Sequence, residues 1–270
     1  MAWSGLWPKG NSIVKLALSQ ALPVDGRVDV AFSQIERALS AAAAAEARLL
    51  VLPELLLPGY NRPDLHATLA QPRDGEWMQR LRQMARHHGC GLVLGWAERA
   101  EDKVYNVASA LGPEGELLAH YRKIQLFGAM ERQSFARGTE APPVFDLDGR
   151  RFGLLICYDV EFPGHVAALA ALGAEVLLVP TANPLGYEHV QRALIPARAH
   201  ESRLIIAYAN YTGSEAGLTF GGRSLIVGPD AEPLAQAGLA AALMIVDLPP
   251  LGAWPDTAHS VQAAEYLPTR

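Results

Sequence analysis

The chain has 270 residues, of which 50% are hydrophobic and 19% charged, and its formal net charge is −5. The apolar content is too high for a disordered chain, and the length is sufficient for one large folded domain. The basic residues are scattered among acidic ones, which argues against the basic patch or stripe of a nucleic-acid-binding protein.

The two cysteines, Cys90 and Cys157, are too few for a disulfide framework or a cysteine-based zinc site. A single Cys90–Cys157 bridge remains as an alternative, although both residues lie in strand-like segments. At the N-terminus, Lys15 interrupts the apolar run 13–18, and no apolar run is long enough to span a bilayer. We therefore expect a cytoplasmic protein without a signal peptide.

The hydrophobic pattern predicts strands and helices that alternate along the chain. Residues 13–19 alternate as a strand with one solvated face does, the Ala-rich residues 28–45 have apolar positions at helical spacing, and residues 48–53 form a short apolar strand. Further strands are predicted at 91–96, 104–112, 116–121, 151–157, 175–180, 204–209, 223–227 and 241–246, and further helices at 76–88, 166–172 and 188–203.

Two turns are predicted within this series. The sequence GPEG at 112–115 joins two of the strands, and GPD at 228–230 is expected to join the strands 223–227 and 241–246. The alternation predicts one α/β domain over residues 1–270, with helices that cover the sheet faces. Residues 1–11 are expected to form an N-terminal extension, and residues 251–270 a tail that is a candidate for a subunit interface.

Cys157 lies where a predicted buried strand ends and the chain turns toward a helix. A thiol at such a place lies at the rim of a sheet, near the free N–H groups of a helix start, and can act as a nucleophile. The alternative is a buried structural thiol, because free cysteine is among the most buried residue types.

Two other predicted strands also end in chemically useful side chains. Glu54 follows strand 48–53, and Lys123 follows strand 116–121. Because working residues of α/β folds gather at the carboxyl ends of strands, Glu54 is a candidate base for the thiol and Lys123 a candidate partner for an oxyanion. The alternative for both is an ordinary solvated surface residue.

Three segments of the chain resemble the nitrilase superfamily of carbon–nitrogen hydrolases. They are LPELLLPGYN at 52–61, YRKIQLF at 121–127 and LICYDVEFP at 155–163, in the family's order of Glu, Lys and Cys. The similarity continues through 105–106, 179–183, 192–203 and 208–210, and so covers nearly the whole chain except its ends.

The resemblance implies a four-layer α-β-β-α sandwich with two mixed sheets, a homodimer packed through outer helices or a higher homo-oligomer, a small-molecule amide substrate, and neither metal nor organic cofactor. It implies Glu54 as general base, Lys123 as oxyanion partner, Cys157 as nucleophile and the Tyr158 N–H as a second oxyanion donor. The segment FGAMERQSF at 127–135 is similar to the family segment with a second glutamate, which makes Glu131 the residue that helps to place the substrate amide.

The residues after the thiol indicate the branch of the family. Nitrilases usually have Trp-Glu there, whereas Tyr158-Asp159 resembles amidases, in particular bacterial aliphatic amidases such as 5-aminopentanamidase and the R-stereoselective amidases. Glu161 stands where branches with acidic substrates often have Arg, which predicts a neutral or amine-bearing amide. The alternative is that Glu161 pairs with a nearby Arg. Gly164 departs from those relatives, which often have Glu there.

Four more residues are candidates for the wall of the substrate pocket: Tyr60, Asn61, Tyr105 and Asn183. For Tyr60 the alternative is core packing with a satisfied hydroxyl, and for Asn183, which precedes Pro184, a turn residue.

The expected function is hydrolysis of a small aliphatic primary amide to a carboxylic acid and ammonia through a Cys157 thioester. Within the family, an N-carbamoyl-amine hydrolase or a nitrilase is the alternative. Outside it, the alternatives are a Cys–His hydrolase that uses His165 or His200, a redox thiol protein without a resolving cysteine, and a non-catalytic binding protein on the same fold.

Overall fold

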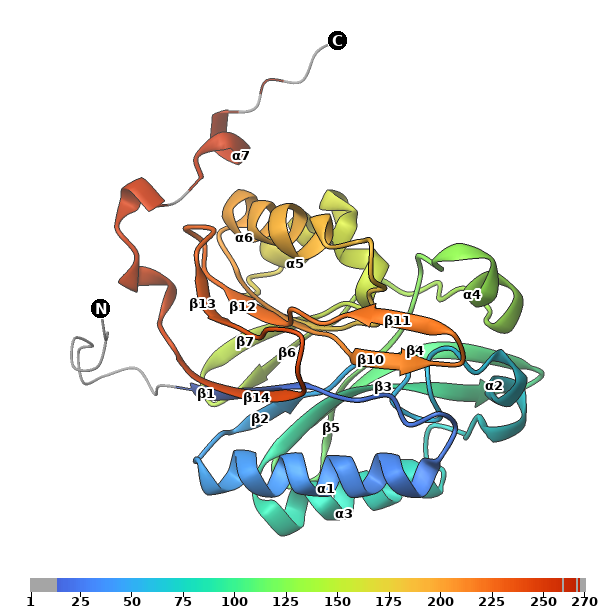
Figure 1. Cartoon of the computed structure of the whole chain (residues 1–270). Coiled ribbons are helices and arrows are strands. Elements are labelled where there is room, and N and C mark those ends of the chain that lie inside the picture. The colour runs from blue at the N-terminus through green and yellow to red at the C-terminus, as the bar shows by residue number, and fades with distance from the viewer. Residues whose placement is uncertain (1–13, 259, 266, 268–270) are drawn as a thin grey trace.

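The computed structural model describes residues 14–258, 260–265 and 267, so the predicted extension 1–11 lies outside the described residues. Within the described part of the chain there are two six-stranded sheets, a separate two-stranded hairpin, and helices on the outer faces of the sheets (Figure 1). The first sheet has the order β14-β1-β2-β3-β4-β5 and the second β13-β12-β9-β8-β7-β6.

The first sheet is built from β1 (Val14–Gln20), β2 (Leu49–Val51), β3 (Gly91–Ala100), β4 (Lys103–Leu111), β5 (Leu117–Arg122) and β14 (Ala242–Leu248). The second is built from β6 (Val144–Leu147), β7 (Arg150–Leu154), β8 (Val176–Pro180), β9 (Ile205–Ala209), β12 (Leu225–Val227) and β13 (Pro233–Gln236). In each sheet three central strands are parallel, β1-β2-β3 and β7-β8-β9, and the outer pairs are antiparallel.

The helices and the hairpin complete the molecule: α1 (Val28–Ala44), α2 (Pro63–Leu69), α3 (Glu76–His88), α4 (Gly128–Ser134), α5 (Pro163–Ala171), α6 (Ile195–Ser202), α7 (Gln262–Glu265), β10 (Thr212–Glu215) and β11 (Leu218–Gly221). Figure 1 shows α1 and α3 against the outer face of the first sheet and α5 and α6 against that of the second. The predicted four-layer α-β-β-α sandwich with mixed sheets is thereby confirmed.

The two sheets pack face to face through fully buried aliphatic side chains, among them Leu16, Val51, Leu154, Leu178 and Ile205. Such packing removes the inner faces of both sheets from water, which is the main stabilising term of a sandwich. As a result, β2 and β8 are apolar throughout, as the sequence pattern predicted, and β7 is apolar from Phe152 to Leu154.

The outer helices have one apolar face each. In α1 the buried residues Phe32, Ile35 and Leu39 recur every three or four positions, which places them on the side that packs against the first sheet. Helix α3 ends at Gly89 in the left-handed conformation with φ of +62°, where glycine avoids the steric cost that a side chain would bring.

The structure differs from the predictions in its connections. The turn at 228–230 leads from β12 into β13, not into strand 241–246, and that prediction was wrong. The later segment, β14, crosses to the first sheet and pairs with β1, with Val246 opposite Leu16. Strand β13 gave no apolar signal because it is a short edge strand that is only partly buried.

Two strands that lead to candidate site residues end earlier than predicted. β2 ends at Val51 and β7 at Leu154, so Glu54 and Cys157 both lie in irregular backbone beyond the sheets. The predicted helix 188–203 begins with a π-helical turn, Val190–Leu194, before α6. The departure at Gly164 leaves the start of α5 intact, because the helix begins at Pro163 and a Cβ at Gly164 would meet no neighbour within 4 Å.

Cys90 and Cys157 are both free, so the alternative of a disulfide between them is wrong. None of the helices in the described part of the chain is long and apolar enough to cross a membrane.

Candidate active site

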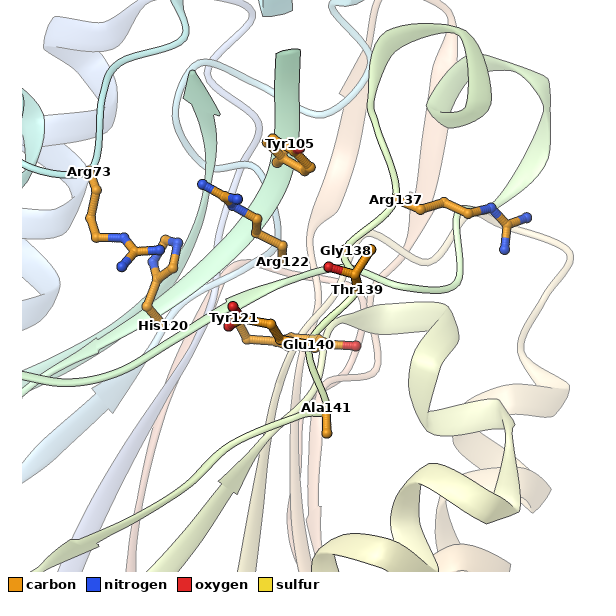
Figure 2. Close-up of a pocket in the computed structure, with 10 residues that line it drawn as sticks. All are labelled: Arg73, Tyr105, His120, Tyr121, Arg122, Arg137, Gly138, Thr139, Glu140 and Ala141. Atoms are coloured by element: carbon orange, nitrogen blue, oxygen red, sulfur yellow. The ribbon is translucent and has the colours of Figure 1, made fainter. Parts of the chain in front are cut away.

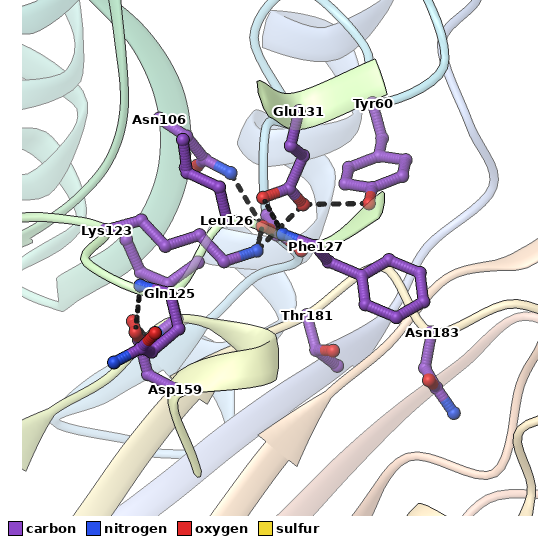
Figure 3. Close-up of polar contacts among 12 residues, drawn as sticks. Tyr60, Asn106, Lys123, Gln125, Leu126, Phe127, Glu131, Asp159, Thr181 and Asn183 are labelled. Atoms are coloured by element: carbon purple, nitrogen blue, oxygen red, sulfur yellow. Dashed lines mark hydrogen bonds and ion pairs between the residues drawn. The ribbon is translucent and has the colours of Figure 1, made fainter. Parts of the chain in front are cut away.

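Lys123 joins two glutamates in the interior of the protein. Its Nζ lies 2.6 Å from Glu54 Oε1 and 2.8 Å from Glu131 Oε1, and all three side chains are fully buried. Figure 3 shows the ammonium of Lys123 directed at the carboxylate of Glu131. Three predicted site residues from different parts of the chain therefore form one network.

The position of Glu54 depends on contacts from two strands, β3 and β4, and from the segment after β9. Asn106 of β4 donates from Nδ2 to Glu54 Oε1 at 2.7 Å, and the Tyr211 hydroxyl donates to the main-chain oxygen of Glu54 at 2.9 Å. Gly95 of β3 donates from its N–H to Pro53 O at 3.0 Å, and a Cβ at Gly95 would overlap the main chain of Glu54. Only glycine allows β3 to approach this closely.

Glu131 lies in α4, and two hydrogen-bond donors hold its carboxylate. The Tyr60 hydroxyl donates to its Oε1 at 2.8 Å, and the Phe127 N–H donates to its Oε2 at 3.0 Å (Figure 3). Tyr60 is 3% exposed, so its hydroxyl orients Glu131 and is satisfied by it. This contact matches the core alternative for Tyr60 more closely than a free pocket wall.

The electrostatics of the network follow from burial and charge. Burial raises the pKa of Glu54 to about 7, Lys123 opposes the shift and Glu131 adds to it. Burial also disfavours the ammonium of Lys123, but Glu131 and Glu54 outweigh it and raise the Lys123 pKa well above its ordinary value. Lys123 therefore stays charged, and Glu54 is a carboxyl whose proton affinity suits transfer near neutral pH. Its Oε2 is buried without a hydrogen-bond partner among the described residues.

Cys157 is the first residue of a 3-10 helix, Cys157–Glu161, and has a left-handed backbone with φ of +46°. This conformation costs a non-glycine residue about 1–2 kcal/mol, and such strain is often found at functional turns. Burial raises the pKa of the thiol well above its ordinary value, Glu54 adds to the shift, and Lys123 opposes it. The resting sulfur is therefore a thiol that needs a base, and it lies within the electrostatic reach of Glu54 and Lys123.

Tyr158 follows Cys157 at the start of the same 3-10 helix, where the first N–H groups have no partner inside the helix. Its ring is part of an aromatic group with Phe127 at 5.3 Å and Phe162 at 4.9 Å between ring centroids. Tyr187 extends this group, 5.5 Å from Phe127.

Glu161 is half-buried, and burial raises the pKa of its carboxyl, while His189, Lys123 and Arg198 oppose the shift. The guanidinium of Arg198 pairs with Glu201 at 3.0 Å and donates to the main-chain oxygen of Glu161 at 3.0 Å. Arg198 is therefore not an ion-pair partner of the Glu161 carboxylate, which weakens the alternative of a structural pair.

The structure directs the side chain of Asn61 away from the Lys123 network. Asn61 Nδ2 donates to Glu215 O at 3.2 Å and to Ala216 O at 3.1 Å, and its main-chain N–H donates to the Glu215 carboxylate at 2.6 Å. Both amide hydrogens are thus committed to the β10–β11 hairpin, and the contact with substrate stays a prediction without support from this geometry.

Asn183 is 4% exposed, and Figure 3 places it near Thr181 at the end of β8. Its Nδ2 donates to Tyr187 O at 3.0 Å and to Gln191 Oε1 at 2.9 Å. The side chain therefore holds the segment that carries Tyr187, and its direct contact with substrate stays a prediction.

Tyr105 was expected in the substrate pocket but lines a different cavity. Its ring lies under the guanidinium of Arg122, 4.2 Å away, and the cavity has a volume of about 60 Å³ (Figure 2). Neither Glu54 nor Cys157 lines that cavity. Because side chains alternate along a strand, its neighbour Asn106 points to the opposite face and contacts Glu54 instead.

Sequence reasoning missed several residues of the site. Asn106, Gly95 and Tyr211 contact Glu54, and Asp159 contacts the chain on both sides of Lys123. The strand period could have identified Asn106, which lies in a predicted strand beside Tyr105. Asp159 lies in the family segment 155–163, but the sequence analysis used it only to indicate the branch. Gly95 and Tyr211 depend on approaches between distant segments, which leave no local signal. Within the described ranges, no group of His, Cys, Asp and Glu side chains is placed to hold a metal ion.

Comparison with known proteins agrees with this geometry. The family model for carbon-nitrogen hydrolases matches residues 15–255. The chain is 40% identical over 244 residues to the "Hydrolase in pqqF 5'region" of Pseudomonas protegens, which spans 90% of this chain and 85% of that protein. It is 38% identical over 238 residues to an (R)-stereoselective amidase of a Pseudomonas species, which spans 87% of this chain and 85% of the amidase.

Solved structures of an amidase from a Nesterenkonia species are also similar. A double mutant of it in complex with acrylamide has a TM-score of 0.85 and 38% identity, over 91% of this chain and 94% of that one. A single mutant, with acrylamide added at the active-site cysteine, has a TM-score of 0.83 and 37% identity, over 87% and 93% of the two chains. The predicted resemblance is confirmed, and the chain belongs to the carbon–nitrogen hydrolases of the nitrilase superfamily.

Proposed function

We propose that this protein hydrolyses a small aliphatic primary amide to a carboxylic acid and ammonia, through a thioester on Cys157. The observation that carries the proposal is the buried network of Glu54, Lys123 and Glu131 beside a thiol on a left-handed turn. The names of similar proteins, an (R)-stereoselective amidase and a 2-oxoglutaramate amidase, agree with it.

In the first half-reaction, Cys157 Sγ forms a bond to the amide carbon while Glu54 accepts the thiol proton. The electron pair of the carbonyl bond moves to oxygen, and the Lys123 ammonium and the Tyr158 N–H stabilise the oxyanion. The carbon–nitrogen bond then breaks, Glu54 transfers its proton to the leaving nitrogen, and ammonia and a thioester result. The pKa of about 7 for Glu54 suits both directions of this transfer.

In the second half-reaction, water attacks the thioester carbon and Glu54 accepts a proton from it. The carbon–sulfur bond breaks, Cys157 regains a proton, and the carboxylic acid leaves. Lys123 serves the same oxyanion in both halves, because its charge is maintained by the two carboxylates. Glu131 contributes by holding Lys123 and by accepting from the substrate NH₂ group.

The test is a panel of primary amides, N-carbamoyl amines and nitriles, with released ammonia as the readout, for the wild type and Cys157→Ala. We expect ammonia from amides and none from the variant. Turnover of carbamoyl amines or nitriles alone would assign the protein to another branch of the family. Ammonia release that survives in Cys157→Ala would refute the thioester.

The half-buried carboxylate of Glu161, unpaired by Arg198, supports a preference for a neutral or amine-bearing amide. An ammonium on the substrate would meet a negative charge and nearby aromatic rings, which favour cations. Comparison of 5-aminopentanamide with an amide of similar length that ends in a carboxylate tests this preference. A higher kcat/KM for the acidic amide would contradict it.

We also propose that the protein forms a homodimer through its outer helices, as the resemblance implies. Leu172, directly after α5, is 53% exposed, so a substitution there tests whether this outer helix takes part in the interface. Light scattering after size exclusion would give the mass in solution, and a Leu172→Asp variant would separate an interface on α5 from one formed by the tail 251–270. Whether the protein is cytoplasmic stays a prediction.

A further inference from the structure

Asp159 connects the lysine segment to the cysteine turn. Its Oδ1 accepts the Gln125 N–H at 2.9 Å, and its Oδ2 accepts the Tyr121 hydroxyl at 3.0 Å and the Ile156 N–H at 3.4 Å. Tyr121 and Gln125 lie two residues before and two residues after Lys123, and Ile156 directly precedes Cys157. One carboxylate therefore contacts the chain around both reacting residues, and Figure 3 shows its contact with Gln125.

The Asp159 carboxylate is shielded from solvent. Asp159 is fully buried, and Tyr121 is 2% exposed. Burial raises the pKa of Asp159 to about 6, while the charge of Lys123 and the hydrogen bonds that the Asp159 carboxylate accepts oppose the shift. At neutral pH the side chain is therefore mainly ionised and accepts all three hydrogen bonds, which are stronger for a charged acceptor.

The two segments that Asp159 joins depend on contacts with other parts of the chain to keep their conformation. Lys123 is beyond the end of β5 and has left the sheet, although its main chain still bonds to Asn106 O and Gly138 N at 2.9 and 2.8 Å. Cys157 has a left-handed backbone that persists only if its surroundings hold it. The Ile156 N–H, and the Asp159 N–H that donates to Ile156 O at 3.0 Å, close the turn on either side of Cys157.

We propose that Asp159 is a positioning residue, which sets the distance and orientation between the Cys157 thiol and the Lys123 ammonium by holding both of their chain segments at once. This inference rests on the proposed amide hydrolysis for its kinetic consequences. Asp159 itself touches neither Sγ nor Nζ among the hydrogen bonds and ion pairs of the described residues. Its loss would therefore act on the chemical step and not on the binding of substrate.

The first test is Tyr121→Phe, which removes one donor to Asp159 without a change in charge or shape. A small displacement of catalytic groups slows the chemical step, so we expect kcat to fall by about 3- to 10-fold with KM within about twofold of the wild type. Asp159→Asn replaces one of the two accepting oxygens with an NH₂ group, which then faces either the Gln125 N–H or the Ile156 N–H, and we expect kcat to fall by about 10- to 100-fold. A purely structural role would lower the melting temperature and the active fraction but leave the kcat of the folded fraction unchanged.

The matched control is Asp146→Asn, because Asp146 is an exposed acid that pairs with Arg151 on the surface. The rate of Cys157 alkylation by iodoacetamide, followed by intact mass, is measured for all variants and needs no amide turnover. Slower alkylation in Tyr121→Phe would support the proposal even if the wild type hydrolyses no amide. Unchanged alkylation and unchanged kcat in Tyr121→Phe would overturn it, including where Asp159→Asn fails to fold.

Discussion

Gly95 and Glu54 are in direct main-chain contact: β3 approaches so closely that a Cβ on Gly95 would overlap the Glu54 backbone. The Gly95 N–H donates to Pro53 O at 3.0 Å, which holds the residue before Glu54 against the strand. A residue without any reactive group therefore decides where the proposed base lies.

We expect Gly95→Ala to lower kcat by about 10- to 100-fold, because the new Cβ displaces Glu54 from the thiol. The matched control is Gly89→Ala at the end of α3, where a Cβ would meet no neighbour within 4 Å. Its positive φ makes alanine cost about 1 kcal/mol of stability without an effect on kcat. Steady-state kinetics and urea denaturation of both variants check this, and equal kcat values would contradict it.

The pH profile should reflect Glu54. A general base must be ionised, and burial raises the pKa of Glu54 to about 7, so kcat/KM should rise with pH through about 7 and be lost below it. The hydrogen bond from Asn106 lowers this pKa, so Asn106→Leu should move the acid limb to higher pH. Ser214→Ala, on the exposed hairpin, is the control and should leave the limb in place. An unmoved limb in Asn106→Leu would count against Glu54 as the titrating base.

Tyr60→Phe should lower kcat/KM, because Tyr60 holds Glu131 in place. The hydroxyl of Tyr60 donates to the buried Glu131 carboxylate at 2.8 Å, and such bonds to charged groups contribute about 1.5–3 kcal/mol. We expect kcat/KM to fall by about tenfold or more. In a double-mutant cycle with Glu131→Gln the two effects should not add, because the residues act through one contact. Additive effects would mean that Tyr60 acts on the substrate directly.

Asn61→Ala separates a structural role from a substrate contact. Its two Nδ2 hydrogen bonds hold the β10–β11 hairpin, so we expect the free energy of unfolding to fall by about 1–2 kcal/mol with little change in KM. Urea denaturation and amide kinetics measure the two quantities. A tenfold rise in KM at unchanged stability would restore Asn61 as a substrate-binding residue.

The elements that sequence reasoning placed well are those with a strong local pattern. The apolar strands β2 and β8, the strand β7 with its apolar end Phe152–Leu154, and the amphipathic helices α1 and α3 were all predicted, since burial on one or both faces dictates their residues. Short or partly exposed elements were missed, among them α2, α4, β6, the β10–β11 hairpin and β13. Their order is set by contacts with other segments and not by their own hydrophobic period.

The sequence by itself determined the α/β class, the family, and the candidate residues Glu54, Lys123 and Cys157, because each of these residues follows a predicted strand and lies within a family segment. Only the tertiary structure decided that Lys123 lies between two buried carboxylates, that Asn106 and not Tyr105 faces Glu54, and that Asp159 joins the lysine and cysteine segments. Apart from the pair of Lys123 and Glu131, these relations join residues that are distant in the chain, and their geometry depends on how the two sheets pack, which no local stretch of sequence encodes.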